Sequence, residues 1–343
     1  MKNLLSALLL LPLAAAGALA QGGERPLDPR SLDLSAVVGI EATILPEGST
    51  AGSLGSTRLG NGVLIDAAEG LVLTIGYVVL EAAAVDLLIA APDPAAATRR
   101  VPAEVLAYDG ETGFGILRAS ARLGLEAMAI GESAALEPRD PLLSVTWSDA
   151  GPVIAPALLM ARREFAGYWE YLLPDALFAA PSRPNWAGAA LLDAEGRLVG
   201  LGSLQVGDTI GAAEAGGPVI AGNMYVPIDA LKPIYGELVS FGRSRKAARP
   251  WLGLHSTELR GQVVVVRTTE RSPAAEAGIE PGEIVQAVKG EPVTGLADFY
   301  RKLWALGDAG VEVPLTLRGP DGRRELTVKS VDRVSRLRLD QTL

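Results

Sequence analysis

The chain of 343 residues has few side chains that could carry out covalent chemistry. It contains no cysteine, which excludes a disulfide framework, a thiol nucleophile and thiolate metal ligands. Its one histidine is His255, so a zinc site built on several histidines is excluded as well. We therefore expect no metal ion and no other cofactor.

Serine hydroxyls, with a lysine as base, are the remaining candidates for nucleophilic chemistry. A nucleophile and its base must lie within hydrogen-bonding reach of each other. The serines that could serve are Ser133, Ser144, Ser182 and Ser203. Lysines are few, and none accompanies these serines in a motif, so we expect ordinary turn chemistry from them instead.

The segment that holds these serines is built from short apolar runs separated by Gly, Pro, Asp or Asn. The runs are Val37–Leu45, Gly62–Ile65, Leu71–Thr74, Val85–Ala90, Val101–Ala107, Phe114–Leu117, Leu142–Trp147 and Pro152–Met160. Each has the length of a strand, and no helical pattern lies between them. Such spacing predicts an all-β barrel or sandwich.

The end of this first part is marked by a hairpin, a helix and a linker. Residues 189–201 predict a hairpin in which Gly196 supplies a positive φ. A helix is expected from Asp229, as its cap, to Phe241, with Gly242 as its stop. The basic, small residues 242–250 then predict an inter-domain linker.

After Trp251 strands and helices alternate in a module of roughly 85–90 residues, a common domain size. Its predicted strands are Gln262–Arg267, Ile284–Val288 and Val313–Leu317, with a hairpin turn at Asp321-Gly322. Ser272-Pro273 and Gly278 are expected to bound a first helix, and Thr294 and Gly307 a second. The pattern predicts a compact α+β domain.

The N-terminus has the pattern of a secretory signal peptide. Lys2 supplies the positive charge, Leu4–Ala16 the apolar core, and Ala18-Leu19-Ala20 a small-residue cleavage site. We expect cleavage after Ala20, a flexible lead over residues 21–35, and a location in the periplasm or outside the cell. An uncleaved membrane anchor is the alternative. No later segment is long and apolar enough to span a membrane.

The formal net charge of −9 gives the chain no electrostatic reason to bind nucleic acid or an anionic membrane. We therefore expect neither as a partner.

Several segments in this order resemble the HtrA/DegP-type serine proteases, and the resemblance covers about residues 35–335. Gly62–Asp66 and Leu73–Val79 resemble the surroundings of the catalytic His, Tyr108–Arg118 those of the Asp, Pro184–Leu192 the nucleophile loop, and Ala129–Ser133 and Met224–Ile228 flanking strands. The resemblance implies a mainly β protein: a trypsin-like double β-barrel at 36–241, a linker at 242–250 and a PDZ domain at 251–335.

All three positions that the resemblance assigns to the catalytic triad have changed. Tyr77 stands at the His position, Gly113 at the Asp position and Ala187 at the Ser position. A serine protease needs an attacking oxygen, a base near neutral pKa and an acid that orients the base. Tyrosine, with an ordinary pKa near 10, is a poor base at neutral pH. We therefore expect no working triad and no catalytic residue.

The nucleophile loop departs from the family pattern Gly-Asn-Ser-Gly-Gly in other ways. Asn185 tolerates a positive φ, but Trp186 is bulky. Trp186 could fill the primary specificity pocket or simply plug a disused cleft, and both readings stay open.

The second domain keeps more of the binding residues that the resemblance implies. Trp251-Leu252-Gly253-Leu254 resembles the loop whose successive backbone amides bind a peptide's C-terminal carboxylate. The peptide would add as a strand beside Leu254–Thr257, against the helix from Thr294. The expected peptide-binding residues are Leu252, Gly253, Leu254, Phe299 and Leu303.

Purely structural roles for some of these residues remain open. Phe299 and Leu303 have a spacing that core packing would also explain. Arg249 could bring positive charge to the carboxylate or be a solvated linker residue. His255 is expected to be a surface strand residue without a ligand.

The leading hypothesis is a secreted pseudoprotease that binds peptides or protein C-termini, as an adaptor, chaperone or regulator in the cell envelope. The alternative is an active serine endopeptidase with an altered site. A third hypothesis is a structural subunit, since the resemblance implies homotrimers or mixed assemblies with active HtrA-type relatives.

Overall fold

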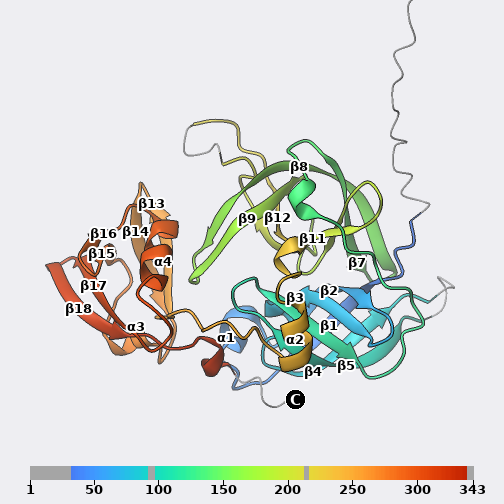
Figure 1. The fold of residues 1–343 in the computed structure, drawn as a ribbon, viewed down its shortest axis with the longest axis horizontal. Helices are drawn as coiled ribbons and strands as arrows, with labels where there is room; N and C mark the ends of the chain where they lie inside the picture. Colours follow the sequence, from blue (N-terminus) through green and yellow to red (C-terminus); the bar gives the residue numbers. More distant parts are fainter. Residues whose placement is uncertain (1–31, 92–96, 212–215, 338–343) are drawn as a thin grey trace, which may run out of the picture.

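The computed structural model describes residues 32–91, 97–211 and 216–337. The chain forms two β-barrels and a smaller domain beside them (Figure 1). The predicted signal peptide, its cleavage site after Ala20 and most of the lead over residues 21–35 lie outside the described residues. Within them, no helix is long and apolar enough to cross a membrane.

The first barrel closes in the strand order β1-β2-β3-β6-β5-β4. Its strands are β1 (Val37–Ile44), β2 (Thr57–Asp66), β3 (Leu71–Ile75), β4 (Ala82–Ile89), β5 (Arg99–Tyr108) and β6 (Phe114–Ala119). A short helix α1 (Ala51–Leu54) follows β1, and the 3-10 helix η2 (Gly76–Val78) follows β3. The apolar runs of the sequence therefore become strands whose buried side chains fill the barrel.

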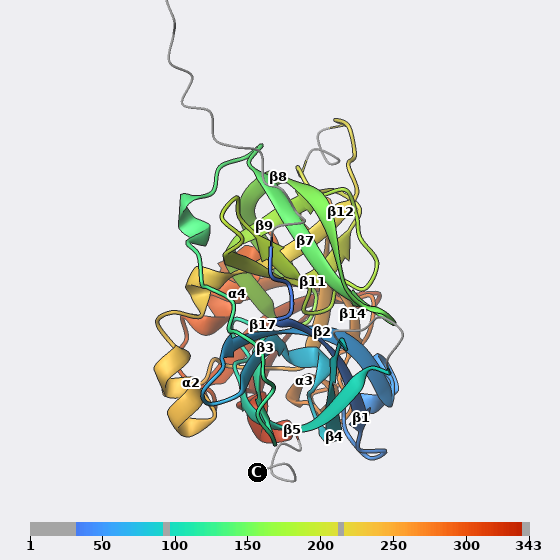
Figure 2. The ribbon, with the colours of Figure 1, turned by 90° about the vertical axis from the view of Figure 1, so that its right-hand side faces the viewer.

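The second barrel closes in the order β10-β11-β12-β9-β8-β7 and lies above the first in Figure 2. Its elements are β7 (Pro141–Ser148), β8 (Gly151–Gly167), β9 (Tyr171–Ala180), β10 (Ala190–Leu192), β11 (Leu198–Val206), β12 (Gly222–Pro227) and the 3-10 helix η3 (Ser133–Ala135). The hairpin at 189–201 forms as predicted, with Gly196 at φ 76°. The predicted run Pro152–Met160 covers only the first part of the long β8, and the strand β9 was not predicted.

The expected single helix from Asp229 to Phe241 was wrong. The segment splits into the 3-10 helix η5 (Ile228–Ala230) and the helix α2 (Tyr235–Phe241). Pro233 lies between them and has no backbone N–H for a continuous helix. Asp229 instead accepts a hydrogen bond from the amide of Ala134 at 2.7 Å. Gly242 ends α2 in the left-handed region, as expected.

The smaller domain is an antiparallel sheet in the order β13-β14-β15-β17-β18, with β13 at one edge. Its elements are β13 (Leu254–Leu259), β14 (Gln262–Thr268), α3 (Pro273–Glu276), β15 (Ile284–Val288), β16 (Glu291–Pro292), α4 (Leu296–Trp304), β17 (Glu312–Gly319), β18 (Gly322–Lys329) and η6 (Val334–Arg336). A buried cluster between the sheet and α4 is its core.

One of the two predicted helix caps in this domain is correct. The Ser272 hydroxyl accepts from the amide of Ala275, which caps α3. Thr294 does not cap α4, because the N-cap is Gly295. Thr294 instead donates its amide and its hydroxyl to Asp298.

Candidate functional site

The three positions that the resemblance assigned to the catalytic triad lie in neighbouring segments of the structure. Tyr77 lies in η2, and the amide of its neighbour Gly76 donates to the carbonyl of Gly113 at 2.7 Å. Ala187 faces them across β2, where a Cβ built on Gly60 would lie 2.8 Å from Val78 and 3.2 Å from the carbonyl of Ala187. Tertiary structure thus assembles the positions while their side chains are not those of a triad.

The Tyr77 hydroxyl is held in a structural hydrogen-bond network. It donates to the carbonyl of Ser203 at 2.7 Å, and the side chain of Trp186 also hydrogen-bonds to it. Burial raises the pKa of Tyr77 well above its ordinary value. The phenol therefore stays protonated at neutral pH and cannot serve as a general base.

Gly113 sits at φ 83°, where a side chain would be strained, and leaves no carboxyl at the Asp position. The nearby Asp109 is occupied within its own turn. Its carboxylate accepts from the amide of Thr112 at 2.8 Å and from the Thr112 hydroxyl at 2.6 Å. This carboxylate closes the turn before β6 and does not replace the missing acid.

The nucleophile loop is fixed by a residue that the sequence reasoning missed, the buried Asn61 of β2. Its side-chain amide donates to the carbonyls of Asn185 and Ala187, each at 2.7 Å, and its oxygen accepts from the amide of Trp147. Gly188 passes so close that a Cβ would lie 2.1 Å from the Asn61 carbonyl. A polar residue inside the apolar part of β2 was the available signal.

The hydroxyls of three of the four candidate serines have a structural partner, and Ser203 forms its contact through the backbone carbonyl. The Ser144 hydroxyl lies 3.0 Å from the Tyr225 hydroxyl in the buried interior. Ser133 accepts from the amide of Asp229, and Ser182 accepts from the side chain of Gln205. The carbonyl of Ser203 is the acceptor of Tyr77. These contacts agree with ordinary structural roles.

The loop at the start of the smaller domain has the geometry of an anion site. Gly253 takes φ 82°, and a Cβ there would lie 2.2 Å from the Cβ of Ser272. Only glycine fits without a shift, and the turn aims the amides of Leu252 and Leu254 at one point. Both leucines are buried in one cluster with Phe299 and Leu303.

Two family models match the chain. A trypsin-like peptidase domain matches residues 60–201, and a PDZ domain matches residues 250–329. The chain belongs to the HtrA-type serine protease family with a C-terminal PDZ domain. The mainly β double barrel followed by an α+β PDZ domain is confirmed.

Individual relatives of this HtrA-type chain are distant. It is 25% identical to the periplasmic serine endoprotease DegP of Salmonella typhimurium over 70% of its length and 50% of that protein. It is 25% identical to the periplasmic pH-dependent serine endoprotease DegQ of Escherichia coli over 76% of its length and 56% of that protein. The chain therefore spans about half the length of these curated relatives.

A solved structure of the HtrA-type protease AlgW with a decapeptide shares the fold. The TM-score is 0.50 at 19% identity, over 87% of this chain and 96% of that one.

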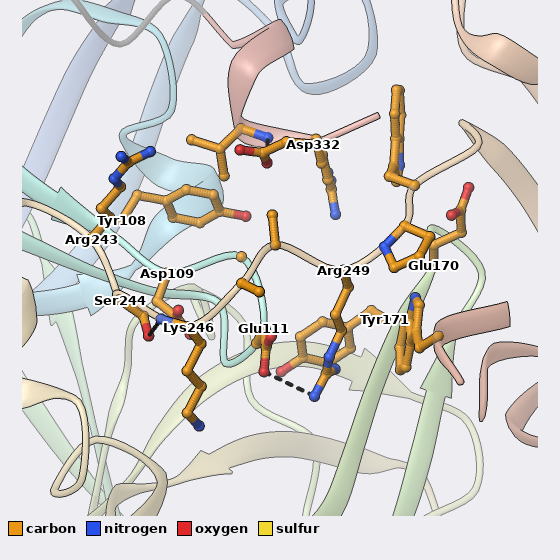
Figure 3. A pocket seen from close by; sticks show the side chains of 18 of the residues that line it. Tyr108, Asp109, Glu111, Glu170, Tyr171, Arg243, Ser244, Lys246, Arg249 and Asp332 are labelled. Atoms are coloured by element: carbon orange, nitrogen blue, oxygen red, sulfur yellow. Dashed lines mark hydrogen bonds and ion pairs between the residues drawn. The ribbon is translucent and has the colours of Figure 1, made fainter. Parts of the chain in front are cut away.

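The amides of the PDZ loop of this HtrA-type chain already hold a carboxyl group. The Glu170 side chain accepts from the amide of Leu254 at 2.7 Å and from that of Leu252 at 3.0 and 3.2 Å. Glu170 belongs to the turn between β8 and β9 in the second barrel (Figure 3). Sequence reasoning missed this residue, because its partners lie in another domain.

A cavity of about 410 Å³ opens beside this contact, between the barrels, the linker and the PDZ domain (Figure 3). Arg249 crosses it, with an ion pair to Glu111 at 2.8 Å and its guanidinium 4.4 Å from the ring of Trp304. Arg249 is thus an exposed linker charge that pairs with Glu111, which agrees with the second of its two expected roles.

His255 is half-buried on β13. Its Nε2 lies 3.1 Å from the Thr269 hydroxyl, and its ring contacts that of Tyr168. It lies far from the triad positions in the chain and meets the tip of the β8–β9 turn instead. Among the residues that the structure describes, no group of three His, Cys, Asp or Glu side chains could hold a metal ion.

Proposed function

We propose that this chain is an HtrA-type pseudoprotease that binds peptides or protein C-termini through its PDZ domain. The proposal depends on the triad positions, which carry Tyr77, Gly113 and Ala187. Acyl transfer requires an oxygen nucleophile, and Ala187 has none. The base is also missing, because Tyr77 has a raised pKa and a hydrogen-bonded hydroxyl.

The binding role is supported by the geometry of the PDZ loop. Its residues Leu252, Gly253 and Leu254 present amides to a carboxyl group, and Phe299 and Leu303 lie in the apolar cluster behind them. Backbone amides perform this task without any particular side chain, so the site survives sequence drift.

The setting that we propose is the cell envelope, in the periplasm or outside, with a role in protein quality control as an adaptor or regulator. The periplasmic relatives support this location. The proposed domain organisation is a trypsin-like domain at 36–241, a linker at 242–250 and a PDZ domain at 251–335.

Assembly as a homotrimer, or with active HtrA-type relatives, is part of the proposal, and analytical ultracentrifugation of the purified chain tests it.

Loss of proteolysis is tested with unfolded casein and a fluorophosphonate probe that labels active serines. We expect no cleavage and no labelling, while an active HtrA-type protease treated in parallel gives both. The relatives DegP and DegQ are serine endoproteases, which favours the alternative of an active serine endoprotease. Labelling at a single serine of this chain, with cleavage lost when that serine is changed, would establish the alternative.

A further inference from the structure

The turn between β8 and β9 leaves the second barrel and reaches the PDZ domain, as Figure 1 shows beside α4. Glu170 is 7% exposed, and both of its carboxyl oxygens accept hydrogen bonds from the PDZ loop. A peptide's terminal carboxylate would need these same amides. Two carboxyl groups cannot share the amides of Leu252 and Leu254.

The same turn also occupies the free edge of the PDZ sheet. β13 is an edge strand, paired on one side with β14. On its other side the amide of Ser256 donates to the carbonyl of Tyr168 at 2.8 Å. The Tyr168 ring lies 5.6 Å from that of His255. An added peptide strand would form its main-chain hydrogen bonds at this edge.

The helix side of the groove holds the turn as well. The buried Tyr300 of α4 donates its hydroxyl to the carbonyl of Gly167 at 2.7 Å and accepts from the amide of Glu170 at 3.2 Å. Leu172 belongs to the buried cluster that contains Leu252, Leu254, Phe299 and Leu303. The hairpin thus supplies a carboxyl group, a strand carbonyl and an apolar side chain, as a C-terminal peptide would.

Glu170 has a left-handed backbone conformation, and the hairpin of its own barrel does not call for a glutamate at this position. It is the last of three loop residues between β8 and β9 and has φ 57°. Three-residue hairpin loops place a left-handed residue there, and glycine takes that conformation with less strain. The side chain is therefore explained by its contacts with the PDZ loop and not by the needs of the turn.

We propose that the β8–β9 turn, residues 167–172, is an internal ligand that closes the PDZ groove, and that an external C-terminal peptide binds by displacing it. This inference rests on the proposed peptide-binding function. The displacing ligand must present a free carboxylate and an apolar last side chain, since those are the groups that Glu170 and Leu172 provide.

When the turn competes with an external peptide, only molecules whose groove is open can bind it. The apparent Kd is then the intrinsic Kd divided by the fraction of open molecules. Removing the internal carboxyl should therefore raise the affinity. The probe is a fluorescein-labelled octapeptide that ends in leucine with a free carboxylate, and the same peptide amidated is the control. Fluorescence polarisation measures its Kd for the full chain.

Glu170→Lys removes the acceptor and places a cation at the amides. We expect its Kd for the leucine peptide to fall by about tenfold or more, since hydrogen bonds to a charged group are each worth this order. Tyr300→Phe keeps the ring and loses the two hydrogen bonds to the turn, so a smaller fall is expected. Glu164→Gln on the same hairpin removes only a partly exposed ion pair with Arg301, and its Kd should stay within about twofold.

A disulfide lock gives an independent test, because the chain has no cysteine of its own. In Tyr168→Cys/His255→Cys, oxidation should close the groove and abolish binding, and dithiothreitol should restore it. Binding of the peptide to the disulfide-bonded form would contradict the closed turn.

The two proposals fail in different ways. Equal Kd values for the wild type and Glu170→Lys would overturn the internal ligand and leave peptide binding intact. If folded Glu170→Lys, with an unchanged near-UV spectrum, bound no peptide ending in leucine, valine or phenylalanine, the proposed function would fall and the internal ligand with it.

Discussion

At the scale of single residues, Glu170 is subject to opposed forces. Burial raises its pKa to about 7, while the amides of Leu252, Gly253 and Leu254 and the charge of Arg333 act in the other direction. His255 and Tyr300 face the same turn. Burial lowers the pKa of His255 to about 4 and raises that of Tyr300, so both are neutral near pH 7. Glu170 is thus the group that titrates there.

The sign of the pH effect follows from linkage. An undocked, hydrated Glu170 would have a pKa near 4.5, below the docked value of about 7. Docking therefore takes up a proton within this window, and the docked state weakens as pH rises from about 4.5 to 7. Above pH 7 both states are ionised and the effect levels off.

We therefore predict that the wild type binds the leucine octapeptide more tightly at pH 8 than at pH 5. The peptide's own carboxylate titrates below pH 4, outside this window. Glu170→Gln cannot titrate at this position and should lose the tighter binding at high pH, and any remaining slope belongs to His255, whose pKa burial against the turn lowers. Polarisation titrations at constant ionic strength measure both, and a wild-type slope that persists in Glu170→Gln would assign the effect to another group.

The triad positions give a second prediction at this scale. Ala187→Ser restores a hydroxyl, but no histidine lies within residues 36–241 and Gly113 provides no acid. The hydroxyl then keeps its ordinary reactivity. We expect no casein cleavage and no fluorophosphonate labelling above the wild-type background. Rapid labelling of this variant would reveal a base that the geometry does not identify.

At the scale of elements, the strands were predictable because apolar runs and turn residues alternate along the chain. The β8–β9 hairpin was harder to predict from the sequence, because Pro174 and Asp175 interrupt the apolar pattern of β9. The break of the 229–241 helix follows from Pro233, which the periodic reading overlooked. The PDZ loop was predicted from Leu252 to Leu254, but its occupant Glu170 comes 82 residues earlier, and only tertiary structure brings them together.

The nucleophile loop is kept in shape by one buried side chain, that of Asn61. Asn61→Ala would leave the carbonyl of Asn185 and the amide of Trp147 without this partner, while the carbonyl of Ala187 would keep only its bond from the backbone amide of residue 61. Buried polar groups without hydrogen bonds are costly, so we predict a loss of roughly 2–4 kcal/mol in the free energy of unfolding. Urea titration followed by tryptophan fluorescence measures it.

A matched control is Gln205→Ala, which removes an exposed amide bonded to Ser182. Its cost should stay below about 0.5 kcal/mol. Equal effects of the two substitutions would mean that the loop is not held by Asn61.

At the scale of the whole molecule, the PDZ domain is joined to the barrels through the linker and the β8–β9 turn. The linker contributes the exposed pair of Arg249 with Glu111, a contact that water and salt weaken. The turn contributes the buried contacts of Glu170, Tyr300 and Leu172. Domains with small shared interfaces move relative to each other by default, so the turn should fix their arrangement.

Displacement of the turn should then loosen the molecule. We predict that saturating leucine octapeptide increases the radius of gyration of the wild type in small-angle X-ray scattering. Glu170→Lys should show the larger value without peptide and change little when peptide is added, whereas Glu164→Gln should behave as the wild type. The closed arrangement is the compact one because the buried contacts hold it, so peptide binding that left the wild type compact would mean that the groove can be filled while the turn stays docked.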